Sequence, residues 1–259
     1  MMFREQISSY APVNEQERSD KKHIYHYIEQ FPYNILHREN TLAHITSSGL
    51  IMNKDLTKVL VIYHKIYQAW GWTGGHADGD EDLLKIALKE AKEETGLKSI
   101  VPLSKGIMAM DILPVWGHKK QGHYVSAHLH LNVAYVLIAD ELEAICANLE
   151  ETDGAKWIDI EEMGHHSSEP KLIYVYEKLI KAAQAFDPKK EDIKVSKRET
   201  KKTSAYDAIK NAAIPIAIHE TKSAYYKAKL VKEIVVRGGG GIKGTSSTII
   251  RQIMKHKKK

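Results

Sequence analysis

The sequence predicts an α/β sandwich, in which helices pack on a mixed sheet, followed by a basic C-terminal extension. Strand-like runs and amphipathic helical patterns are interspersed along the chain as far as Phe186. Beyond that point the composition changes: residues 1–186 hold 19 Lys+Arg against 26 Asp+Glu, whereas residues 187–259 hold 19 against 7. We therefore expect an acidic folded part and a separate basic extension.

The individual elements follow from hydrophobic spacing and turn residues. Helical spacing of Ile24 and Ile28 before Pro32 predicts a helix within an N-terminal helical segment, residues 1–39. Strict alternation of apolar and polar residues over 125–133 predicts a strand with one polar face. In chain order we expect a helix at 15–31, a hairpin of strands at 44–52 and 58–64, a glycine-rich loop at 71–80, a helix at 82–95, the strand at 125–133, a helix at 140–148, a strand at 156–158 and a helix at 170–185.

Composition argues against disulfide-bonded, secreted and membrane-spanning proteins. The only cysteine is Cys146, which excludes an intrachain disulfide and a multi-cysteine zinc site. The N-terminus lacks an apolar stretch behind a basic start, and the longest apolar runs are only as long as strands. We expect a cytoplasmic protein without a signal peptide or a membrane span.

A fixed spacing of glycine and acidic residues runs from the loop into the helix at 82–95. Five residues separate Gly75 from Glu81, and seven residues separate Glu81 from the run Lys-Glu-Ala-Lys-Glu-Glu-Thr-Gly-Leu, which extends from Lys89 to Leu97. At about 100° per residue, one helical face is apolar and another gathers three glutamates within an arc of roughly 100°. Those glutamates are Glu90, Glu93 and Glu94.

Three neighbouring carboxylates repel one another when they are ionised. A hard divalent cation such as Mg²⁺ relieves that repulsion and can also bind water and substrate phosphates. Such an ion lowers the pKa of water and neutralises diphosphate oxygens, so the pattern indicates metal-assisted hydrolysis. A solvated helix with carboxylate–lysine pairs is the simpler interpretation of any Glu/Lys-rich helix, but the spacing across loop, helix and Gly96 favours a site.

The stretch from Gly75 to Leu97 resembles the Nudix box, G-x5-E-x7-R-E-U-x-E-E-x-G-U with U apolar, and the wider resemblance covers residues 40–186. It implies a Nudix-type α/β/α sandwich that hydrolyses a diphosphate linkage in a nucleoside diphosphate linked to another group. It also implies Mg²⁺ as cofactor, with Mn²⁺ as a substitute. The implied catalytic and metal-binding residues are Glu90, Glu93 and Glu94, with the carbonyl of Gly74 as a further ligand, and the implied structural residues are Gly75, Glu81, Lys89 and Gly96.

One fixed position departs from the family pattern. Lys89 replaces the arginine that would form a structural ion pair with Glu81, and lysine cannot reproduce the bidentate fork of arginine. Every metal-binding carboxylate is present. The departure therefore concerns the bracing of the loop rather than the chemistry.

Candidate substrate-binding residues lie outside the helix. His128 and His130, on the polar strand face, could meet phosphate or base edges, although a water-facing strand explains them equally well. Trp72 could stack on a base or pack in the core. Glu151 could supply a further metal ligand or a general base, or be an exposed loop carboxylate.

The sequence does not decide the role of the basic extension or exclude two alternative functions. With a net charge of +12, residues 187–259 could make a weak nucleic-acid contact, or form a partly helical or disordered appendage. A different class of function is a non-catalytic nucleotide-sensing module with a nucleic-acid-binding tail. A diphosphate isomerase would need a placed cysteine, and Cys146 falls in a predicted helix. The sequence leaves a homodimer open, and the expected partner is a small-molecule nucleoside diphosphate derivative.

Overall fold

A computed structural model describes residues 2–65, 68–120, 122–148, 152–166 and 170–188. Met1–Pro188 form one compact unit, so the N-terminal helical segment and the predicted domain at 40–186 fold together. The predictions for the basic extension beyond Pro188, and for Glu151, lie outside the described residues.

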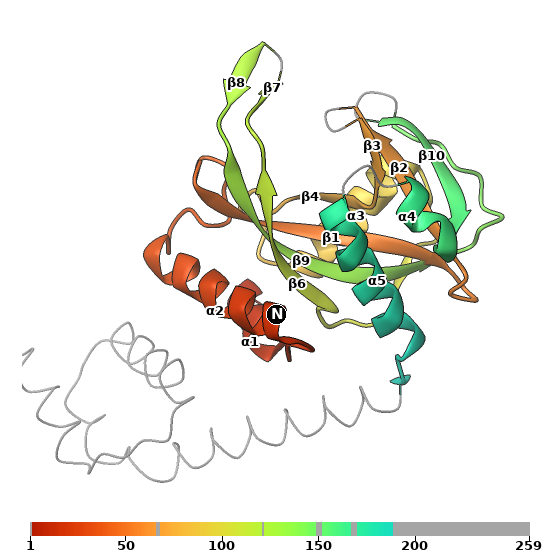
Figure 1. Cartoon of the computed structure of the whole chain (residues 1–259), viewed down its shortest axis with the longest axis horizontal. Helices are drawn as coiled ribbons and strands as arrows, with labels where there is room; N and C mark the ends of the chain where they lie inside the picture. The colour runs from red at the N-terminus through yellow and green to blue at the C-terminus, as the bar shows by residue number, and fades with distance from the viewer. Residues whose placement is uncertain (1, 66–67, 121, 149–151, 167–169, 189–259) are drawn as a thin grey trace, which may run out of the picture. The chain divides into compact units, whose positions relative to one another are not determined.

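An eight-stranded mixed sheet organises this unit (Figure 1). The main path runs β10–β2–β1–β9–β5, and its central strands β1 and β9 are parallel while the other pairs are antiparallel. β3 pairs with β2, β4 with β1, and β6 with β9. β7 and β8 form a separate hairpin that extends away from the sheet. The strands are β1 Ala43–Asn53, β2 Lys58–His64, β3 Ala69–Gly71, β4 Thr73–His76, β5 Val101–Pro102, β6 Ala109–Val115, β7 His118–Lys120, β8 His123–Val125, β9 His128–Ala139 and β10 Thr152–Asp159.

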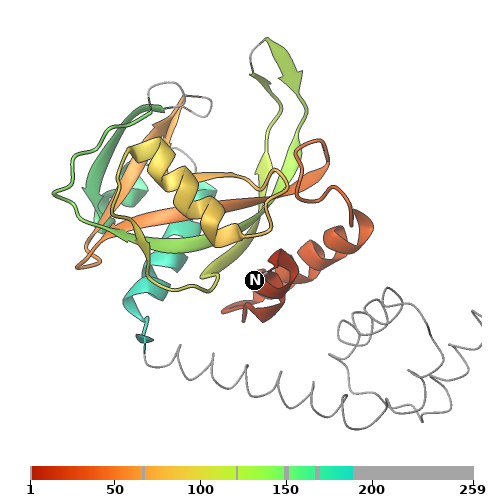
Figure 2. The same cartoon turned by 180° about the vertical axis from the view of Figure 1, so that it is seen from behind.

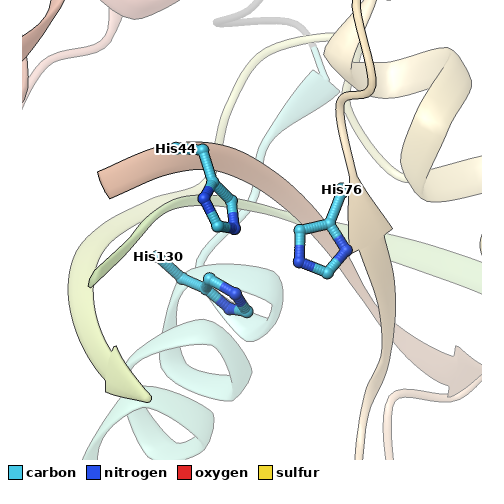
Figure 3. Close-up of side chains that lie close together, drawn as sticks. All are labelled: His44, His76 and His130. Carbon is cyan, nitrogen blue, oxygen red and sulfur yellow. The ribbon is translucent and has the colours of Figure 1, made fainter. Parts of the chain in front are cut away.

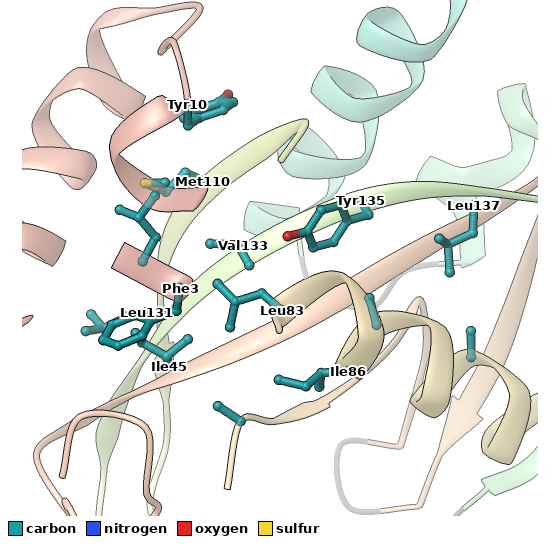
Figure 4. Packing of buried hydrophobic residues seen from close by; sticks show 14 of the residues in the cluster. Phe3, Tyr10, Ile45, Leu83, Ile86, Met110, Leu131, Val133, Tyr135 and Leu137 are labelled. Atoms are coloured by element: carbon teal, nitrogen blue, oxygen red, sulfur yellow. The ribbon is translucent and has the colours of Figure 1, made fainter. Parts of the chain in front are cut away.

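Helices cover both faces of the sheet, which confirms the predicted α/β sandwich (Figures 1 and 2). On one face, α1, α2 and α3 share a core with the sheet, as Figure 4 shows for Phe3, Leu83 and Tyr135. On the other face, α5 packs on residues such as Val136. The helices are α1 Phe3–Ser9, α2 Glu15–Gln30, α3 Leu83–Thr95, the 3₁₀ turn η1 Ile160–Glu162, α4 Met163–His166 and α5 Pro170–Gln184.

The predicted helix at 140–148 is wrong. The side chain of Asp140 accepts the N–H of Leu142, and the backbone N–H groups of Cys146 and Asn148 donate to the carbonyls of Thr95 and Glu94 at the end of α3. Because these contacts use the donors that a local helix would need, this segment runs irregularly alongside α3.

The loop predicted at 71–80 is wrong in its first half, where β4 pairs with β1. Thr46–Gly49 of β1 offer free backbone groups to residues 73–76, whereas β2 pairs farther along β1. The strand predicted at 125–133 begins at His128, because the chain leaves the β7–β8 hairpin at Val125. Within the described ranges, no helix is long and apolar enough to cross a membrane.

Candidate active site

The glutamate-bearing helix α3 begins and ends where the sequence predicts. The Asp82 side chain caps it by accepting the N–H of Lys85 at 3.2 Å. Gly96 ends it in the left-handed conformation, with φ of 72° and its N–H donating to the carbonyl of Lys92. A Cβ at Gly96 would lie 2.5 Å from the carbonyl oxygen of Cys146, so glycine is required there for space as well as conformation.

The glutamates of α3 meet the two glycines of β4. Glu94 is 4% exposed, and its Oε2 accepts the backbone N–H of Gly74 at 3.1 Å. Glu90 lies against Gly75, since a Cβ at that glycine would come within 2.4 Å of the Glu90 carboxyl carbon. The glycine pair therefore allows strand and helix to approach closely enough for both carboxylates to line the backbone of β4.

Lys89 neutralises part of this carboxylate cluster. Its Nζ lies 3.0 Å from an oxygen of Glu93 and 3.4 Å from an oxygen of Glu90. The hydrogen bond to Glu93 and the charge of Glu90 raise the pKa of Lys89. The predicted Glu81–Lys89 ion pair is not among the ion pairs of the described residues. Glu93 lies one turn along α3 on the same side, so the lysine reaches it with no need for the fork that arginine would offer.

The glutamates fit a magnesium ion by the chemistry of their donors. Carboxylate oxygens are hard ligands, and Lys89 already places a cation between Glu90 and Glu93. Among the described residues, however, only a group of histidines brings three side-chain donor atoms within 4.8 Å of one another. The three carboxylates are less tightly gathered than that. Glu93, with a side chain 54% exposed, is free of core packing and able to rotate toward the others.

The substrate-binding candidates differ in how accessible their side chains are. Trp72 is 8% exposed and packs edge-on against Tyr176, with ring centroids 5.3 Å apart, which is the core packing expected as the alternative to base stacking. His128 and His130 remain partly accessible at the start of β9, with their Nε2 atoms 3.3 Å apart.

Sequence reasoning missed His44 and His76, which join His130 in one cluster (Figure 3). The ring centroid of His44 lies 4.9 Å from that of His76 and 5.1 Å from that of His130. Burial lowers the pKa of His44, and burial together with the neighbouring histidines lowers the pKa of His130 to about 2. The parallel register that sets His44 opposite His130 is the signal that a sequence alone does not carry.

Comparison with known proteins matches residues 43–179, more than half of the chain, to the model of the NUDIX domain. No curated protein matches the chain. Among solved structures, the chain is similar to an Ap4A hydrolase from C. elegans in a binary complex, with 15% identity, a TM-score of 0.42, and coverage of 55% of this chain and 98% of the other. A NUDIX hydrolase from Clostridium perfringens shows 22% identity, a TM-score of 0.39, and coverage of 53% and 96%. The E. coli dihydroneopterin triphosphate pyrophosphohydrolase shows 15% identity and a TM-score of 0.42, with coverage of 52% of this chain and 94% of the other.

Proposed function

Because this chain belongs to the Nudix family and is a pyrophosphohydrolase, we propose that its substrate is a nucleoside diphosphate linked to another group and that its cofactor is Mg²⁺. The observation that carries the proposal is the meeting of Glu90 and Glu94 with Gly75 and Gly74 across the α3–β4 contact. That contact sets hard oxygen ligands against the backbone of β4, and a Mg²⁺ ion bound to such ligands can also bind diphosphate oxygens.

Each residue of this contact has a defined task in the proposal. Glu90, Glu93 and Glu94 hold Mg²⁺, with the carbonyl of Gly74 as a further candidate ligand. Bound Mg²⁺ offsets diphosphate charge and lowers the pKa of water. Glu93 is accessible enough to accept a proton from the attacking water, because its side chain is 54% exposed. Lys89, which pairs with Glu90 and Glu93 here, retains its charge and can move to a phosphate oxygen when a cation takes its place.

Two alternatives differ from this proposal in what they require. A nucleotide sensor needs no turnover, so the retention of all three glutamates favours the hydrolase. An isomerase needs a cysteine beside the reacting carbon. Cys146 lies beside the C-terminal end of α3, where its backbone N–H donates to the carbonyl of Thr95.

A paired substrate panel tests the proposal. The nucleoside members are ADP-ribose, NADH, diadenosine polyphosphates and nucleotide sugars, and the matched controls are inorganic pyrophosphate and a prenyl diphosphate, which lack the nucleoside. With Mg²⁺ present, we expect release of a nucleoside monophosphate from at least one nucleoside member and a much lower kcat/KM for the controls. Turnover confined to the controls would remove the nucleoside from the proposal while leaving diphosphate hydrolysis intact.

A further inference from the structure

Three imidazoles from three strands converge on one point (Figure 3). Their candidate donor atoms all lie within 4.8 Å of one another. Strand pairing builds the group: His44 of β1 sits opposite His130 of β9 in the parallel register, and His76 of β4 sits opposite Thr46, two residues along β1. All three therefore lie at one end of the sheet, where β1 and β9 begin and β4 ends.

The hydrogen bonds of His44 prepare it to bind a metal. The ring is 3% exposed, and its Nδ1 lies 2.9 Å from the carbonyl oxygen of Asn40. A carbonyl only accepts hydrogen bonds, so Nδ1 carries the hydrogen and Nε2 of the neutral ring presents a lone pair. That Nε2 is buried without a hydrogen-bond partner in the described part of the chain. Histidines that bind metals commonly have this arrangement, in which the second ring nitrogen donates to a backbone carbonyl.

His128 extends the same pattern at the edge of the cluster. Its Nδ1 lies 2.9 Å from the carbonyl of Ser126, which leaves its Nε2 as the lone-pair nitrogen. That atom is 3.3 Å from Nε2 of His130. Two nitrogens on one tetrahedral zinc ion are also about 3.3 Å apart, given Zn–N distances of about 2.0–2.1 Å.

We propose that His44, His76 and His130 bind a Zn²⁺ ion, with His128 beside the open fourth position. Imidazole suits Zn²⁺ and other late transition metals, whereas Mg²⁺ selects oxygen ligands. Donors 4.8 Å apart surround a centre about 2.8 Å from each, so each ring must move inward by only about 0.7 Å to reach zinc distance. Arg38 and Asp78, which both act on His44, pair with each other, so their charges largely offset at the site.

The zinc site is separate from the carboxylates of the Nudix box. Along a strand, successive side chains point to opposite faces. The Cβ direction of Gly75 points at Glu90, so the side chain of the next residue, His76, points to the other face of β4, toward His44. The proposal thus adds a nitrogen-ligated site on the opposite side of β4 from the proposed magnesium ligands.

The test uses the full-length chain, free of any histidine tag and stripped with a chelator. Zn²⁺ affinity is measured by competition with a chromophoric chelator, and the ligand set by the visible absorption of the Co²⁺-loaded protein, which is intense for tetrahedral nitrogen ligation and weak for octahedral oxygen ligation. The variants are His76→Ala and His130→Asn. The control is His23→Ala, an exposed histidine whose Nδ1 also contacts a backbone carbonyl, and Glu93→Gln reports zinc held by the carboxylates instead.

We expect wild type, His23→Ala and Glu93→Gln to bind one Zn²⁺ with equal affinity and to give the tetrahedral Co²⁺ spectrum. His76→Ala and His130→Asn should lose more than about 100-fold in affinity, because even outer-shell changes cost roughly 10- to 100-fold. Unchanged affinity in both histidine variants, or an octahedral Co²⁺ spectrum in the wild type, overturns the proposal. If both variants fail to fold by circular dichroism, the wild-type spectrum alone decides.

Discussion

Replacing Glu94 by glutamine is expected to lower kcat by about 100-fold or more, while leaving the fold intact. The amide keeps a carbonyl oxygen that can accept the N–H of Gly74, which Glu94 now holds at 3.1 Å. It loses the negative charge that a hard cation needs from its ligands. The measurement is steady-state turnover of the best substrate of the panel, together with thermal unfolding of both proteins.

The matched control for that variant is Glu143→Gln. Glu143 also accepts backbone N–H groups with its carboxylate, from Lys98 and Ser99, but it lies beyond the C-terminal end of α3. We expect its kcat to equal that of the wild type. Equal losses in the two variants would mean that carboxylate–backbone contacts in general, and not the charge of Glu94, support the activity.

Replacing Lys178 by methionine is expected to lower the free energy of unfolding by about 3–5 kcal/mol. Lys178 of α5 is 8% exposed, and its Nζ lies 2.8 Å from Glu17 and 2.7 Å from Asp111. Burial raises the pKa of Asp111, while the charge of Lys178 opposes that rise. Without the ammonium, two buried carboxylates lose the positive charge that neutralises them, although Glu17 keeps hydrogen bonds from Val13 and Met110. That loss costs far more than losing an exposed ion pair.

Urea-induced unfolding measures this loss, with Lys181→Met as its control. Lys181 lies on the same helix, but its side chain is 76% exposed and its ion pair with Glu177 spans 3.7 Å. We expect its free energy of unfolding to fall by no more than about 1 kcal/mol. A similar small change for Lys178→Met would show that Glu17 and Asp111 find other partners, and that α2 is not anchored to the sheet through this cluster.

The sequence predicted those parts of the fold whose signals are local. Asp82 and Gly96 fix the ends of α3, so the helix lies where expected. Its glutamates are less tightly gathered than the helical geometry alone predicts. The strand pair at 44–52 and 58–64 likewise forms β1 and β2 around a short turn.

The wrong or missed predictions share a physical cause, which is pairing with residues that are far away in the sequence. Residues 140–148 have helical spacing, but the carbonyls at the end of α3 take the donors of Cys146 and Asn148. Residues 73–76 have the composition of a loop, but they form a strand because they pair with the backbone of β1. The histidine cluster depends on the parallel pairing of β1 with β9, and nothing in the spacing of His44 and His130 along the chain indicates that register.

The metal dependence of turnover tests the central claim most directly. Hydrolysis of the best nucleoside diphosphate substrate is measured in EDTA, after addition of Mg²⁺, and after addition of Mn²⁺, for wild type and Glu94→Gln. We predict no turnover in EDTA, restoration by Mg²⁺ and by Mn²⁺ in the wild type, and no comparable restoration in the variant. Full turnover in EDTA, or substrate binding without turnover at any Mg²⁺ concentration, would contradict the assignment of Glu90, Glu93 and Glu94 as magnesium ligands of a hydrolase.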